Sequence, residues 1–110
     1  MKANMRYTDL GPIEGYVLNV LDRKRMDIIK VGKYKTLQQA KKGAIRYIMT
    51  HKSVKKVYIS RFWTHDGFGD ENYIERTSGV VERTDHSDRF AWAKDHSWTS
   101  ILIDVNGNKI

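Results

Sequence analysis

Two apolar segments in the first third of the chain predict a β-hairpin. Residues 15–21 are rich in β-branched and aromatic side chains, which are typical of a strand. Residues 22–25 form a polar connection of turn length, and residues 26–31 repeat the apolar pattern. We therefore expect a hairpin over residues 15–34, with Gly32 at its end or at a bulge.

After residue 36 the apolar residues recur at the spacing of a helix. Thr36 suits a helix N-cap, and Gln39, three residues later, completes a capping-box pattern. Apolar residues then recur at helical spacing at Leu37, Ala40, Ala44, Ile45, Ile48 and Met49. The pattern predicts a helix over residues 37–50, with its charged residues on the opposite side.

The second half of the chain returns to strand-like patterns. Residues 57–63 predict a strand, with Val57 and Ile59 on one face and Tyr58, Ser60 and Phe62 on the other. A loop is expected over residues 64–70 because it combines glycines with acidic residues.

Residues typical of turns divide the rest of the chain, residues 72–110, into short segments. Ser78-Gly79 indicates a second hairpin within residues 72–84. Asp85 or Ser87 suits the cap of a short helix reaching Lys94, although an irregular segment fits nearly as well. Residues 97–105 predict a strand, and Asn106-Gly107 is the signature of a type I′ turn.

These elements define one α+β domain over residues 1–110. We expect a mainly antiparallel sheet, ββαβ followed by further strands, with the amphipathic helix packed on one face. A chain of 110 residues fits a single domain, and it holds one proline and no linker-like segment.

Composition excludes several function classes. The chain has no cysteine, which removes disulfide scaffolds, cysteine-based zinc sites and thiol nucleophiles. No apolar run reaches the roughly 20 residues needed to cross a bilayer, and residues 1–9 lack a signal-peptide core. We expect a soluble, cytoplasmic protein without a membrane partner.

Charge is distributed unevenly along the chain. The net charge is +7, but residues 1–62 hold 15 basic and 4 acidic residues, a net of +11. Residues 63–110 hold 5 basic and 9 acidic residues, a net of −4. Residues 23–61 alone hold 13 basic residues against one acidic residue, Asp27. Such asymmetry indicates a polyanionic partner, unless the acidic half of the chain folds over the basic half.

The candidate nucleic-acid-binding residues are the cations on the predicted helix and its neighbouring turns: Arg23, Lys24, Arg25, Lys33, Lys35, Lys41, Lys42, Arg46, Lys52, Lys55 and Lys56. Cations spaced to follow phosphates bind nucleic acid mainly through counterion release. Aromatic residues are interleaved with them, and exposed rings would stack on bases, whereas large rings such as that of Trp63 more often belong to a core.

Histidines provide a weaker catalytic candidate. The tripeptide Asp-His-Ser occurs at residues 85–87 and 95–97, and His65 lies upstream. Converging His65, His86 and His96 would suit acid–base chemistry or a metal, but their spacing matches no ligand motif, and Asp-His-Ser is common in turns.

Two main functions follow from the sequence, with no cofactor or metal assigned to either. The first is a small non-enzymatic protein that binds RNA or DNA through the basic helix and its flanking turns. The alternative is a small interaction or inhibitor module, such as a regulatory or phage-like accessory protein, that binds an acidic protein surface of a nucleoprotein machine. A histidine-dependent nuclease is the least supported option.

Overall fold

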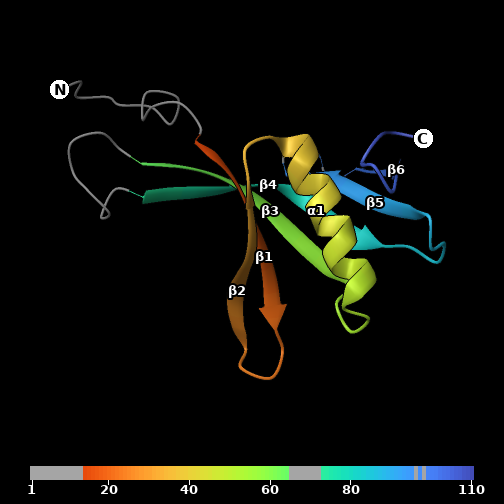
Figure 1. Ribbon diagram of the computed structural model, residues 1–110, viewed down its shortest axis with the longest axis horizontal. Coiled ribbons are helices and arrows are strands. Elements are labelled where there is room, and N and C mark those ends of the chain that lie inside the picture. The colour runs from red at the N-terminus through yellow and green to blue at the C-terminus, as the bar shows by residue number, and fades with distance from the viewer. Residues whose placement is uncertain (1–13, 65–72, 96, 98) are drawn as a thin grey trace.

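In the part of the chain that the structure describes, one antiparallel sheet carries a single helix on one face (Figure 1). The computed structural model describes residues 14–64, 73–95, 97 and 99–110. The strand order is β2-β1-β3-β4-β5-β6, and every neighbouring pair is antiparallel. The elements are β1 (Gly15–Asp22), β2 (Asp27–Tyr34), α1 (Leu37–Thr50), β3 (Lys56–Thr64), β4 (Tyr73–Arg83), β5 (Arg89–Lys94) and β6 (Ser100–Asp104). The predicted α+β class is confirmed.

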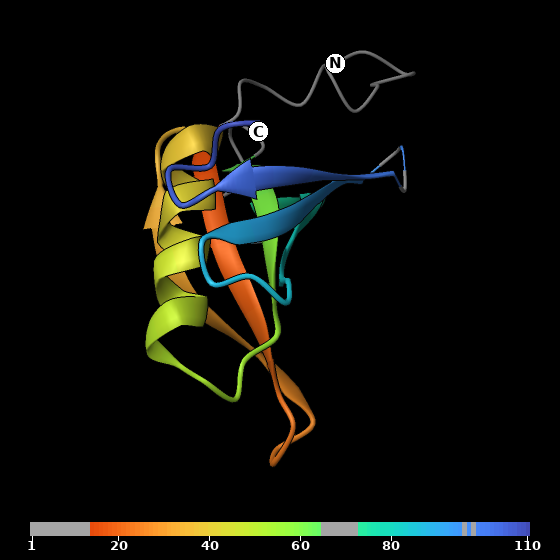
Figure 2. The same ribbon diagram turned by 90° about the vertical axis from the view of Figure 1, so that its right-hand side faces the viewer.

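The first hairpin, β1 and β2, forms as expected. Asp22 closes its turn, since its carboxylate accepts hydrogen bonds from the backbone N–H groups of Lys24 and Arg25. A bulge places Val31 outside the regular pairing, directly before Gly32. Both ribbon views show the hairpin turn reaching past the end of α1 (Figures 1 and 2).

Helix α1 has the predicted bounds. The Thr36 hydroxyl accepts the backbone N–H of Gln39, which satisfies one of the unpaired donors of the first turn. Ala40, Gly43, Ala44, Ile45 and Ile48 are buried against the sheet. The core beneath the helix contains Leu18, Val20, Val57, Ile59, Val81, Phe90, Trp92 and Ile103. Met49, by contrast, is about half exposed, so it does not join the apolar stripe that its spacing predicted.

The predicted second hairpin within residues 72–84 is wrong. Residues 73–83 form one long strand, β4, and Ser78 is the extra residue of a bulge opposite β3. Gly79 directly follows the bulge, and the ring of Trp92 lies directly over it. A Cβ atom at this position would be 2.5 Å from both that ring and the carbonyl oxygen of Ala93. The glycine thus permits close packing and does not form a turn.

The expected short helix after residue 85 is also absent, because β5 occupies residues 89–94. Phe90 and Trp92 are both buried, at the two-residue spacing of a strand. Strand β6 is shorter than predicted. In the turn that follows, the carboxylate of Asp104 accepts the backbone N–H groups of Asn106 and Asn108. Asn106 does not have the positive φ that a type I′ turn requires, whereas Gly107 has φ 81°.

Adding one methyl group at Gly79 tests the contact with Trp92. Gly79→Ala should lower the free energy of unfolding by about 1–3 kcal/mol, because the new Cβ overlaps backbone as well as a buried ring. Gly32→Ala is the matched control, since its nearest neighbours would be side-chain atoms at 3.1 and 3.3 Å. Denaturant unfolding measures both variants, and an equal effect on stability would contradict the packing role of Gly79.

Candidate nucleic-acid interface

Two hollows lie along the line where α1 packs beside the hairpin. The first is beside the initial turns of the helix and the end of β2. Its lining consists of Glu14, Lys33, Tyr34, Lys35, Gln39, Lys42, Gly43, Arg46 and Phe62. The second lies between the end of the helix and the hairpin turn. Its lining includes Asp22, Arg23, Lys24, Ile29, Tyr47, His51, Ser53, Lys55, Lys56 and Tyr58. Arg46 lines the first hollow and Tyr47, the next residue of α1, lines the second, so residues of the same helix contribute to both hollows.

Eight of the eleven predicted cations line these hollows, and all eight are exposed. Four come from the hairpin and the residues after it: Arg23, Lys24, Lys33 and Lys35. The other four come from α1 and the start of β3: Lys42, Arg46, Lys55 and Lys56. We call these sets the hairpin-side cations and the helix-side cations, and together they form the basic seam.

The acidic residues in the described part of the chain form no ion pair with the basic seam. Two described carboxylates line it, those of Glu14 and Asp22. Among the described residues, none of the eight cations has a carboxylate within ion-pair distance, and Asp22 is 3.9 Å from Arg25. Glu82 is the register neighbour of Lys56 across β3 and β4 but forms no ion pair with it. The seam therefore retains an excess of positive charge.

The other three predicted cations lie elsewhere. Arg25 and Lys52 are exposed in turns and line neither hollow. Lys41 lies on α1 but lines neither hollow, and its ammonium group is 4.6 Å from the centre of the Trp92 ring on β5. Burial, together with the like charge of Lys94, holds the pKa of Lys41 below its ordinary value of 10.5. This lysine is therefore part of the packing between α1 and β5.

Most aromatic rings near the seam are engaged in packing. Tyr34 lies against Gly43, where a Cβ atom would overlap its ring. Tyr47 stacks on His51, with ring centres 3.8 Å apart and planes at 14°. Phe62 and Trp63 are buried, and Lys33 lies 4.8 Å from the centre of the Phe62 ring. Tyr58 is the most open of these tyrosines, at 40% exposed.

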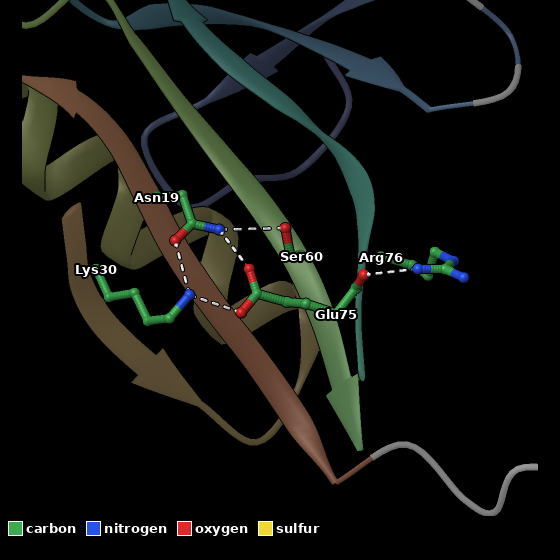
Figure 3. Close-up of polar contacts among 5 residues, drawn as sticks. All are labelled: Asn19, Lys30, Ser60, Glu75 and Arg76. Atoms are coloured by element: carbon green, nitrogen blue, oxygen red, sulfur yellow. Dashed lines mark hydrogen bonds and ion pairs between the residues drawn. The ribbon is translucent and has the colours of Figure 1, made fainter. Parts of the chain in front are cut away.

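A polar network that the sequence reasoning missed lies on the other face of the sheet (Figure 3). The Asn19 amide donates to Ser60 Oγ at 3.2 Å and to Glu75 Oε1 at 2.9 Å. Lys30 donates to Asn19 Oδ1 at 3.4 Å and forms an ion pair with Glu75 at 2.6 Å. Asn19 and Ser60 are buried. These groups satisfy one another, so the network holds four strands together and has a structural role.

The histidine hypothesis receives no support from the described residues. His86 is exposed in the turn before β5, while His65 and His96 lie outside the described residues. Within the described ranges, no group of three histidine or acidic side chains could hold a metal ion. No helix in this same part of the chain has the length and apolar character required to span a membrane.

Comparisons with known proteins supply no further assignment. The chain matches no model of a known protein family, and no significant match was found among curated proteins or solved structures.

The position of Lys41 predicts how its titration responds to Lys94. Lys94→Gln removes a like charge and should raise the pKa of Lys41, but only part of the way to 10.5, because burial is the larger cause. The folded state disfavours the charged form, so Lys41 lowers stability below its folded pKa, and this loss is relieved as pH rises toward 10.5. NMR titration of the lysine ammonium groups measures the shift. Lys109→Gln is the control, and an unchanged pKa in Lys94→Gln would contradict the placement.

Proposed function

We propose that the protein binds nucleic acid, without catalysing a reaction, through phosphate contacts along the basic seam. The observation that carries this proposal is the alignment of eight exposed cations beside α1 with no ion-pair partner among the described residues. Each cation that neutralises a phosphate releases counterions, which supplies most of the affinity of non-specific binding. The cysteine-free sequence supports a cytoplasmic location for this activity.

Contacts of this kind bind the phosphate backbone of the nucleic acid and do not distinguish its bases. Six of the eight seam cations are lysines, which bind phosphate as flexible point charges, and two are arginines. Phosphate contacts position a protein on nucleic acid but carry no direct sequence information. We therefore expect weak dependence on sequence and strong dependence on salt.

A second candidate function is docking on a protein. Leu21, Ile28 and Tyr58 are exposed around the polar network, on the face of the sheet opposite α1. Exposed apolar groups beside a charged pair are typical of interaction surfaces. A protein partner bound to this face would remain bound after nuclease treatment and would not require the seam cations. A partner held only through shared nucleic acid would be lost.

Charge-neutral variants test the proposed function. The triple variant Lys33→Gln, Lys42→Gln and Arg46→Gln removes three seam cations. The control Lys94→Gln, Lys109→Gln and Arg89→Gln removes the same charge from exposed positions outside both hollows. Fluorescence anisotropy with mixed-sequence DNA and RNA across a salt series measures the binding. The seam variant should reduce the slope of log K against log salt by about 2.7, at about 0.9 per lost contact on a duplex.

The control variant should retain most of the slope of log K against log salt. Both triple variants lose the same net charge and hence the same long-range attraction, but phosphate contacts are lost only in the seam variant. Circular dichroism and thermal melting verify that each variant is folded. If the wild-type protein binds neither DNA nor RNA below about 100 μM at low salt, the proposed function is wrong, since non-specific contacts alone reach that range.

A further inference from the structure

We infer that the basic seam is built for double-stranded nucleic acid, with one set of cations on each strand. This inference rests on the proposed function and adds the class of nucleic acid that the seam prefers. Two observations lead to it: the division of the cations into two sets, and the burial or stacking of the aromatic rings beside them.

The first observation is the geometry of the two sets. The hairpin-side cations belong to the edge of the sheet, and the helix-side cations belong to α1 and to the chain after it. Each hollow has cations of both sets in its lining, so the two sets lie around the same hollows but come from different parts of the chain. Two rows of phosphates border each groove of a duplex, whereas a single strand presents one row. The two sets therefore suit the two phosphate strands that border a groove.

The length of the seam fits the same arrangement. Helix α1 has 14 residues and extends for about 21 Å. Successive base pairs rise by about 3.4 Å, so the part of the seam that follows α1 covers about six of them. Four cations on each side can then follow one strand each.

The second observation concerns base stacking. Proteins that bind single strands place successive bases on a series of open aromatic rings. Here the ring of Tyr34 packs on Gly43, and Phe62 is buried. His51 is exposed and stacks with Tyr47, and Tyr58 is the other exposed ring among the described residues that line the seam. Both His51 and Tyr58 line the second hollow. A single strand would thus meet one set of cations and, at one end only, a surface for stacking.

The test compares a duplex of about 12 base pairs, in DNA and in RNA, with each of its separated strands of mixed sequence. We expect the duplex to bind at least about tenfold more tightly than either strand at low salt. The expected salt slope is up to about −7 for the duplex, from eight contacts, and about −3 for a single strand, from four.

Two double variants then test whether both sets of cations take part. Lys33→Gln with Lys35→Gln removes half of the hairpin-side set, and Lys42→Gln with Arg46→Gln removes half of the helix-side set. Each should reduce the duplex slope by about 1.8. Thermal melting verifies folding, and two single variants, Lys24→Gln for the hairpin-side set and Lys55→Gln for the helix-side set, repeat the test in the second hollow.

The outcomes separate this inference from the proposed function. Single strands that bind as tightly as the duplex would overturn the inference and leave nucleic-acid binding intact. Sensitivity to one set of cations alone would do the same. Failure to bind any of these probes would overturn the proposed function itself, and the inference with it.

Discussion

The close approach of α1 to the sheet is the constraint on which the rest of the structure depends. Ala40, Gly43 and Ala44 present almost no side chain at the contact, which lets the helix lie directly on the core. Tyr34 occupies the space that a side chain at residue 43 would need, so the end of β2 is fixed beside the helix. Glycine costs a helix about 1 kcal/mol relative to alanine, and the contact with Tyr34 gives a physical reason for it here. The same contact holds Lys33 and Lys35 beside Lys42 and Arg46 at the first hollow.

The two faces of the sheet therefore differ in character. The face under α1 is apolar, and the helix brings Lys42 and Arg46 beside the edge strand β2. The opposite face carries a satisfied polar network around Asn19, whose partners lie 41 and 56 residues further along the chain. Because an unsatisfied buried amide is costly, this network favours one register for β1, β3 and β4. A fixed register in turn determines where the hairpin-side cations lie.

Local signals predicted the first half of the fold, and long-range packing decided the rest. The capping residue Thr36 and the apolar spacing determined α1 because both act within the helix. Ser78-Gly79 has the composition of a turn, yet the ring of Trp92 from the next strand makes the glycine a packing site. Candidate cations were identifiable from residue type. Their arrangement was not, since it requires knowing that β2 lies beside α1 and that Lys41 packs on Trp92.

Nucleic acid is proposed to bind along the seam between the hairpin and α1. The most direct measurement is NMR mapping of backbone amide shifts during titration with a short mixed-sequence duplex. We expect the shifts to concentrate at residues 23–24, 33–35, 42–46 and 51–56, which line the two hollows or connect their lining residues. Shifts centred on β5 and β6, or on the exposed side chain of Ile28 on the opposite face of the sheet, would contradict this proposal.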